Sequence, residues 1–126
     1  MRTRRLAILL SPLLLIGVVA VAADCKPVAD GKPLSNRLHW TTASEQDSFA
    51  FEVFRSDSET GAASRISATP ILAAGTTDET HRYEYHDTAV EPLRSYWYSV
   101  DLIHTDGSRE RIVSAWKSEP LCSVKS

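Results

Sequence analysis

Short apolar runs alternate with polar, turn-forming stretches along most of this chain. Within the runs, apolar residues recur at every second position rather than at the spacing of a helix. Successive side chains of a strand point to opposite faces, so a period of two predicts strands with one apolar face. The alternating positions are Leu38 and Trp40, then Phe49, Phe51 and Val53, and later Tyr83 and Tyr85.

The boundaries of the runs predict the strands and the turns between them. Strands are expected at 37–42, 49–55, before Pro70, and at 81–87, 95–104 and 109–117. Asp106-Gly107 lies between the last two runs and suits a two-residue hairpin turn. Several short strands separated by turn signals favour an all-β sandwich of antiparallel strands.

The first residues have a different pattern. MRTRR is followed by the apolar run LAILLSPLLLIGVVAVAA, which ends in the A-x-A sequence Ala20-Val21-Ala22. This order is typical of a cleaved signal peptide, so we assign residues 1–23 to it. The chain is therefore expected to be exported, either to the periplasm or out of the cell. No stable membrane span is expected after cleavage.

Two alternatives to cleavage remain open. An uncleaved anchor is one, because the apolar run of about 18 residues is near the minimum for a membrane span. Pro12 and Gly17 interrupt this run, which argues against an anchor. A lipoprotein is the other, because Cys25 lies just beyond the run. Asp24 precedes this cysteine, where lipid attachment favours a small residue.

Removal of the signal peptide changes the charge. The whole chain has 14 basic and 16 acidic residues, and loss of Arg2, Arg4 and Arg5 leaves 11 and 16, a net charge of −5. Nucleic acid and anionic membranes require a basic surface, so neither is an expected partner. The residues from 24 onward suffice for one domain with one core, and no repeat divides them.

The two cysteines lie near the ends of the mature chain. An even number of cysteines in an exported protein suggests a disulfide, here between Cys25 and Cys122. Closing so long a loop contributes about 4 kcal/mol in the simple chain-entropy treatment. Free thiols or a bridge between two chains are the alternatives.

Several motifs together resemble a fibronectin type III domain, particularly the kind found in secreted and cell-surface bacterial proteins. The resemblance covers about residues 38–113 and rests on WTTASE, FEVFRS, YEYHDTAVEP, SYWYSVDL and the later DG, in that order. It implies an immunoglobulin-like sandwich of about seven short strands within 37–126. It also implies that Tyr96 is a tyrosine-corner residue, whose hydroxyl bonds to the preceding loop. The predicted core is Trp40, Phe51, Val53, Tyr85, Val90, Tyr96, Tyr98 and Val100.

The segment 24–36 departs from the family pattern. It has two prolines and little apolar character, so its strand is expected to be short or irregular. Cysteines more than about 7 Å apart at Cα cannot be bridged, and a full-length first strand would carry Cys25 away from Cys122. A tight turn at 29–32 would instead fold Cys25 back toward the end of the last strand.

Candidate chemistry is sparse. Glu45, Asp47 and Asp106 lie in two loops expected at one pole, but calcium needs more oxygen ligands than these supply. Neither zinc-ligand spacing, nor a nucleophile elbow, nor a phosphate loop is present in the sequence. We therefore expect no enzyme activity, metal or cofactor. The alternatives are a small secreted enzyme or metal-binding protein that uses these polar loops, and a structural periplasmic subunit.

The outward faces suggest a binding surface. A two-residue turn at Asp106-Gly107 would place Trp97 opposite Trp116 and Val100 opposite Val113. Phe54 should lie near Trp97, so three rings are expected in one row on a face that is usually polar. Such a row suits contact with a protein or glycan of the cell envelope. Alternatively, the rings only stabilise the sheet, or residues 117–126 cover them.

Overall fold

The computed structural model of the protein describes residues 24–125, so the predicted signal peptide at 1–23 lies outside the described part. Nine strands and no helix are present in this part. It contains no helix long and apolar enough to cross a membrane. The strands are β1 (Lys26–Ala29), β2 (Asn36–Thr42), β3 (Ser48–Ser56), β4 (Ser64–Arg65), β5 (Ile71–Leu72), β6 (His81–Asp87), β7 (Trp97–His104), β8 (Arg109–Lys117) and β9 (Leu121–Val124).

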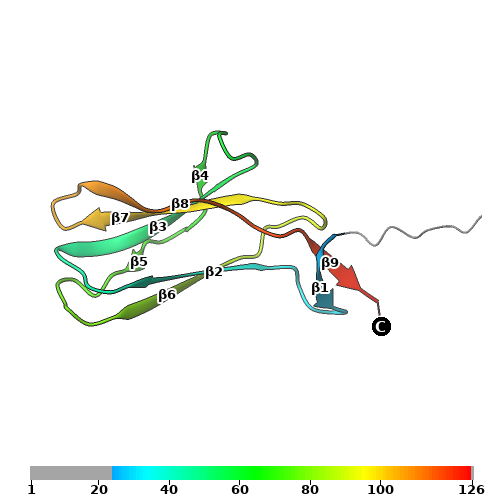
Figure 1. Ribbon diagram of the computed structural model, residues 1–126, viewed down its shortest axis with the longest axis horizontal. Coiled ribbons are helices and arrows are strands. Elements are labelled where there is room, and N and C mark those ends of the chain that lie inside the picture. Colours follow the sequence, from blue (N-terminus) through cyan, green and yellow to red (C-terminus); the bar gives the residue numbers. More distant parts are fainter. Residues whose placement is uncertain (1–23, 126) are drawn as a thin grey trace, which may run out of the picture.

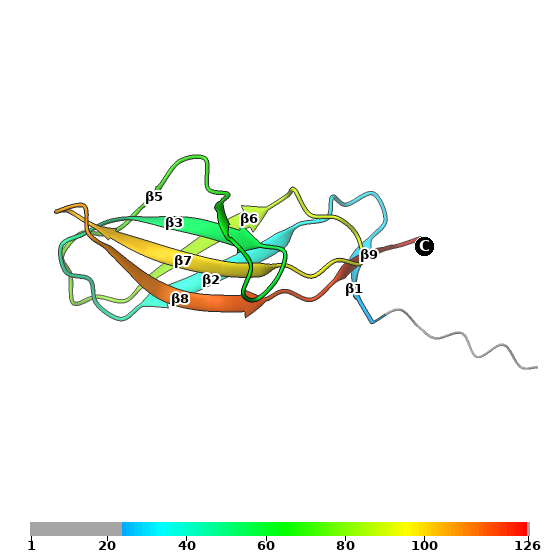
Figure 2. The ribbon, with the colours of Figure 1, turned by 90° about the horizontal axis from the view of Figure 1, so that it is seen from above.

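Two antiparallel sheets form two layers, with β2 and β6 in one layer and a five-stranded sheet in the other (Figure 1). The larger sheet has the order β4-β3-β7-β8, and β5 pairs with β3 near one end. Viewed from above, β2 crosses behind β7 and β8, and β6 lies nearer β3 (Figure 2). The predicted all-β, antiparallel class is therefore confirmed.

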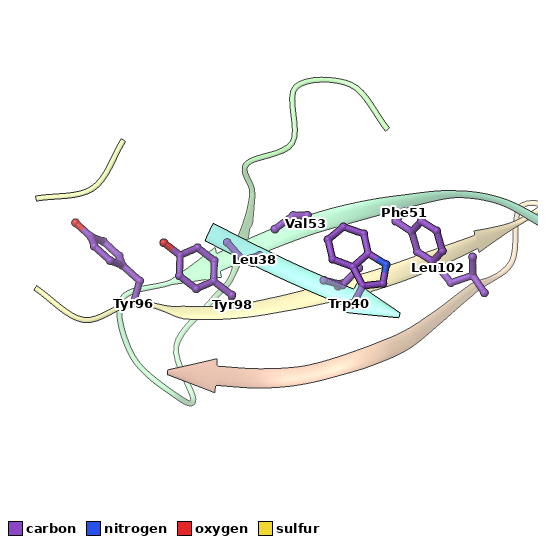
Figure 3. Close-up of a cluster of buried hydrophobic side chains, with 8 residues drawn as sticks. Leu38, Trp40, Phe51, Val53, Tyr96, Tyr98 and Leu102 are labelled. Atoms are coloured by element: carbon purple, nitrogen blue, oxygen red, sulfur yellow. The ribbon is translucent and has the colours of Figure 1, made fainter. Parts of the chain in front are cut away.

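The core lies between the layers and is built around Trp40 (Figure 3). The Trp40 ring stacks on Tyr83 at 5.7 Å between centroids and meets Phe51 edge-on at 5.5 Å. Six predicted core residues are in the buried cluster: Trp40, Phe51, Val53, Tyr96, Tyr98 and Val100. The other two, Tyr85 and Val90, are partly buried and pack against it.

The face predicted for Phe49 is wrong. Phe49 shares the alternation of Phe51 and Val53, but its side chain is 52% exposed. The register of β3 against β7 shifts between Ser48 and Ala50, which marks an irregularity at Phe49. A bulge of this kind turns one residue out of the pleat, so Phe49 leaves the core face while its neighbours keep their places.

The tyrosine-corner contact forms as the resemblance implies. The hydroxyl of Tyr96 accepts a hydrogen bond of 2.9 Å from the backbone N–H of Glu91. Val90, which precedes this residue, packs against the core. The guanidinium groups of Arg55 and Arg94 lie 4.8 and 5.4 Å from the centre of the Tyr96 ring. The loop between β6 and β7 is thus held to the start of β7.

The first and last strands of the described part, β1 and β9, meet at one pole. Cys25 and Cys122 form a disulfide, with their Cα atoms 5.8 Å apart. The expected tight turn is present, because Lys32 N–H donates to the Ala29 carbonyl at 3.1 Å and Gly31 has a φ of 75°. The short strand β1 pairs in parallel with β9, which lies in the segment 117–126 where no strand is predicted. The first strand therefore lies at the pole and pairs with neither layer.

Candidate functional site

The turn between β7 and β8 has three residues rather than the predicted two. His104 N–H donates to the Ser108 carbonyl at 2.9 Å, and Gly107 N–H donates to the His104 carbonyl at 2.9 Å. Gly107 has a φ of 84°, the left-handed conformation that ends a three-residue hairpin loop. The first pairs of the hairpin therefore differ from the predicted ones, and Ile103 lies opposite Arg109.

Two further register shifts occur along β8, on either side of Val113. Val113 still pairs with Val100, as predicted, but Trp97 pairs with Lys117 and Trp116 pairs with Tyr98. The predicted Trp97–Trp116 pair is therefore wrong. Each added residue moves later side chains to the opposite face, so Trp116 shares the inward side of Tyr98.

Phe54 and Trp97 remain on the outward face, but without Trp116. Phe54 is opposite Ser99, and Trp97 is opposite Ser56. A cation from β8 covers each ring: Arg111 lies 5.7 Å from the Phe54 centroid, and Lys117 Nζ lies 5.2 Å from that of Trp97. Such cation–π contacts stabilise aromatic rings at a surface. The outward face thus holds two covered rings and no row of three.

Ion pairs occupy the rest of this outward face. Glu52 is buried and accepts from Arg109 Nη1 at 2.7 Å and from Arg65 Nη1 at 2.9 Å. The hydrogen bond from Arg109 is the main reason that the pKa of Glu52 is lowered, and it outweighs the effect of burial. Arg111 also bonds to Asp101. The charged groups named here therefore bond to one another, and their bonds tie β4, β3, β7 and β8 together.

Trp116 instead borders a groove between the layers. Its side chain is 50% exposed, and its ring lies 6.1 Å from that of Tyr98. The groove has a volume of about 280 Å³ and is lined mainly by apolar groups. We call it the edge groove, and its lining residues are Arg37, Leu38, His39, Trp40, Tyr98, Val100, Val113 and Trp116. A half-exposed tryptophan beside an apolar hollow is the usual form of a contact anchor.

A buried polar network holds the floor of the edge groove in place. The Tyr98 hydroxyl donates to Asp87 Oδ2 at 2.7 Å and accepts from Asn36 Nδ2 at 2.8 Å. Burial raises the pKa of Tyr98 well above its ordinary value, so the hydroxyl keeps its proton. With both partners fixed, the ring of Tyr98 is a rigid surface on which Trp116 rests.

The polar loops lie at the pole away from the disulfide, and the hydrogen bonds of their acids hold the loops in place. Glu45 is buried and accepts from Thr42 Oγ1 at 2.8 Å, from Ala74 N–H at 2.8 Å and from the Tyr83 hydroxyl. Burial alone would raise the pKa of Glu45, but these hydrogen bonds outweigh it and lower the pKa. Among residues 24–125, no group of three or more His, Cys, Asp or Glu side chains gathers as a metal site would require.

Asp47 and Asp106 lie apart from the carboxylate of Glu45. Both line a shallow hollow at the β7–β8 turn. Asp106 accepts from Ser108 N–H at 2.8 Å, which is a turn-forming bond. Asp47 has a φ of 49°, and its carbonyl accepts from Thr105 N–H at 2.8 Å. These two acids therefore shape and join the loops.

The edge groove was missed from the sequence because its anchor depends on the bulges in β8. One signal was present: Ile112 and Val113 are adjacent apolar residues, and both are partly buried. Such a doublet breaks a strict period of two and indicates an irregular strand. The chain matches no protein-family model, no curated protein and no solved structure. The interpretation of the groove therefore depends on its own residues.

Proposed function

We propose that this protein is an exported, non-catalytic binding module of the bacterial cell envelope that holds a partner protein in the edge groove. The observation that carries the proposal is Trp116, a large ring left half exposed above an apolar hollow. Interfaces take most of their binding energy from a few such aromatic anchors set in pockets. Phe54 and Trp97, the other aromatic residues first expected to bind, lie on the outward face, where Arg111 and Lys117 stack on their rings, and they do not line the groove.

Two features support the family and the compartment in this proposal. The strand order β4-β3-β7-β8 facing β2-β6, together with the Tyr96–Glu91 contact, supports a fibronectin type III-like domain. The disulfide between Cys25 and Cys122 supports an oxidising compartment, either the periplasm or the exterior. Domains of this family generally mediate contacts, although a fold alone does not determine a function.

A non-catalytic role is supported by the hydrogen bonds of the buried carboxylates. Glu45 and Glu52 are the two buried glutamates, and hydrogen bonds within the protein engage both oxygens of each. A catalytic acid or base must be free to exchange a proton with a substrate. These two carboxylates instead tie a loop and a set of strands together, which is a structural use.

A photocrosslinking experiment in the native host tests the proposed site. The photoreactive residue p-benzoylphenylalanine replaces Trp116 in one strain, and Leu72 in a control strain. Leu72 is a matched position because it is apolar, 71% exposed and lies on β5, away from the edge groove. Irradiation is expected to give a discrete protein adduct from position 116 and none from position 72.

Three results would argue against the proposal. Equal adducts from both positions would indicate unspecific contact, and no adduct from position 116 would indicate that the groove is unoccupied by protein. An adduct containing glycan alone would indicate that the partner is a glycan and not a protein. In parallel, the partner identified in the adduct is co-purified with unlabelled variants. A Trp116→Ala strain with a normal amount of folded protein should lose this complex, whereas a Leu72→Ala strain should keep it.

A further inference from the structure

The sandwich is closed along one side and open along the other. On the β3–β6 side, the segment 66–74 crosses from layer to layer. The Tyr85 hydroxyl donates to the Ile66 carbonyl at 2.8 Å, and Ala74 N–H donates to the Tyr83 hydroxyl at 3.2 Å. On the other side, β2 pairs only with β6 and β8 only with β7 in the described part of the chain. The edge groove lies along this open side.

The segment that precedes β2 does not close this side. Residues Lys26–Ala29 form β1, which the parallel pairing with β9 and the Cys25–Cys122 bridge hold at the pole. Figure 1 shows β1 and β9 beyond the end of both layers. The edge of β2 is therefore left as an unpaired row of backbone N–H and C=O groups, which is a template for another strand.

The two open edges differ in how well they accept a strand. The register of β8 shifts twice, and bulges of this kind discourage pairing at an edge. In contrast, β2 pairs with β6 over seven successive residues without a shift, and Asn36–Thr42 contains no proline. Natural proteins rarely leave so regular an edge unprotected. The available edge of the open side is therefore that of β2.

The hollow beside β2 continues along the strand. A second hollow, of about 380 Å³, shares Trp40 and Val113 with the edge groove and reaches Leu102 and Glu110. Trp40 is only 7% exposed, and its indole N–H has no hydrogen-bond partner among the described residues. Its nitrogen is on the side of the ring toward Leu102 (Figure 3). An unpartnered buried donor beside the second hollow favours an occupant that supplies an acceptor.

The outer face of the β2–β6 layer is basic, although the mature chain has a net charge of −5. Its exposed side chains in the middle of the two strands are Arg37, His39, Thr41, Arg82, Glu84 and His86. Glu84 is the one acid among them, and Arg37 and His86 both bond to it. A strand added at β2 would place its outward side chains beside Arg37 and His39, where acidic residues pair best.

We propose that the free edge of β2 accepts an extended segment of a partner protein as an added strand, with apolar side chains in the edge groove and acidic side chains alternating with them on the outer face. This inference rests on the proposed function, and it specifies how the partner is held. Backbone hydrogen bonds to β2 supply the pairing, and the hollow beside Trp116 selects a large apolar side chain. The partner is thus recognised by its alternating pattern.

Peptide selection followed by hydrogen exchange tests this inference. Random peptides of about ten residues, the upper range of strand lengths, are selected on the exported, disulfide-bonded chain. We expect the selected sequences to alternate apolar and acidic residues. In the labelled chain, the best peptide should slow exchange of alternate β2 amides by about tenfold or more, because those N–H groups gain partners.

Charge variants at the edge add a second readout. His39→Glu should weaken binding of the selected peptide by roughly two- to fivefold, and His39→Arg should strengthen it, as for exposed ion pairs. His86→Glu is the matched control, because it places the same charge beside Glu84 but on β6, away from the free edge. It should leave the dissociation constant of the peptide nearly unchanged.

Different failures identify different errors. If peptides bind, lose affinity on Trp116→Ala and leave the β2 amides unprotected, strand addition is wrong and the proposed binding groove stands. If binding ignores Trp116→Ala, the proposed function fails as well. If β2 amides become protected with rising concentration of the chain alone, the occupant is a second copy and the inference is overturned. Failure to select any peptide also overturns it, because every side-chain pattern was offered.

Discussion

The hydroxyl of Tyr98 donates a hydrogen bond of 2.7 Å to Oδ2 of the buried Asp87. The same oxygen accepts from Arg55 Nη1 at 2.9 Å, and Asn36 Nδ2 donates to the tyrosine oxygen at 2.8 Å. Four strands, β2, β3, β6 and β7, therefore meet in one polar network inside the protein. A buried network of this kind is stabilising only while every member keeps its partners.

Replacement of Asp87 should be the most damaging change to this network. Asp87→Asn keeps the shape but removes the charge that Arg55 needs, and removal of one partner of a buried pair costs about 3–5 kcal/mol. Tyr98→Phe should cost less, about 1–3 kcal/mol, because it leaves polar groups unpaired but no isolated charge. Urea unfolding of both variants measures this difference. An Asp87→Asn variant that is as stable as Tyr98→Phe would contradict the assigned role of the charge.

The alternation of apolar residues was sufficient to predict most strands and the core. His81–Asp87 and Arg109–Lys117 have the predicted bounds, and Trp40 and Phe51 are buried as expected. These predictions succeeded because burial of one face of a sheet imposes a period of two on the sequence. The same principle failed at Phe49, where a bulge interrupts the pleat.

The candidate site was harder to predict because it depends on register. A single added residue moves a side chain to the other face, and the bulges that place Trp116 in the groove leave only a weak trace in the sequence. The strand β9 was missed for a related reason. It has four residues and one buried apolar side chain, Leu121, and a parallel partner far away in the sequence. Local pattern does not specify such a pairing.

Acid should destabilise the protein through Glu52 and Glu45. In the folded protein, the pKa of each lies below its ordinary value of 4.5, through hydrogen bonds from Arg109 to Glu52 and from Tyr83 to Glu45 that outweigh burial. The unfolded chain then binds protons more readily, so this stability is present above about pH 4.5 and is lost as the pH falls through the folded pKa values. Urea unfolding midpoints between pH 7 and pH 3, a range set by this linkage, measure the loss.

Glu52→Gln provides the comparison for this acid effect. The variant should be less stable than the original chain at neutral pH and should lose less stability on acidification, so that the two converge at low pH. Glu59→Gln, in the exposed turn after β3, is the control and should follow the original chain throughout. If the Glu52→Gln chain and the original chain lose the same amount of stability on acidification, another group causes the loss at low pH.

The bridge at the pole should contribute a large part of the stability. Cys25 and Cys122 are 97 residues apart in sequence, and a loop this long contributes about 4 kcal/mol in the chain-entropy treatment. A Cys25→Ser, Cys122→Ser double variant should therefore unfold at much lower urea concentration, with β1 and β9 separating first. Hydrogen exchange at β1 compared with β7 measures that order. Loss of less than about 1 kcal/mol would mean that the strands at the pole hold the ends without the bridge.

Leu93 has a backbone conformation that suits another residue better. Its φ is 60°, in the left-handed region, and its side chain is 60% exposed, so it contributes little to packing. Its N–H donates to the Leu121 carbonyl at 2.7 Å, a bond that any residue except proline keeps. Asparagine adopts this conformation with less strain, so Leu93→Asn should raise the free energy of unfolding by about 0.5–1 kcal/mol.

Leu72→Asn is the matched control for this change. Leu72 is also an exposed leucine, but it lies in the extended strand β5, where asparagine is disfavoured. The control should leave the free energy of unfolding unchanged or lower it, since nothing in its backbone is relieved. If Leu93→Asn is no more stable than Leu72→Asn in urea unfolding, the left-handed conformation of Leu93 is not a source of strain. A gain confined to position 93 would assign the effect to the backbone, because both variants lose the same side chain.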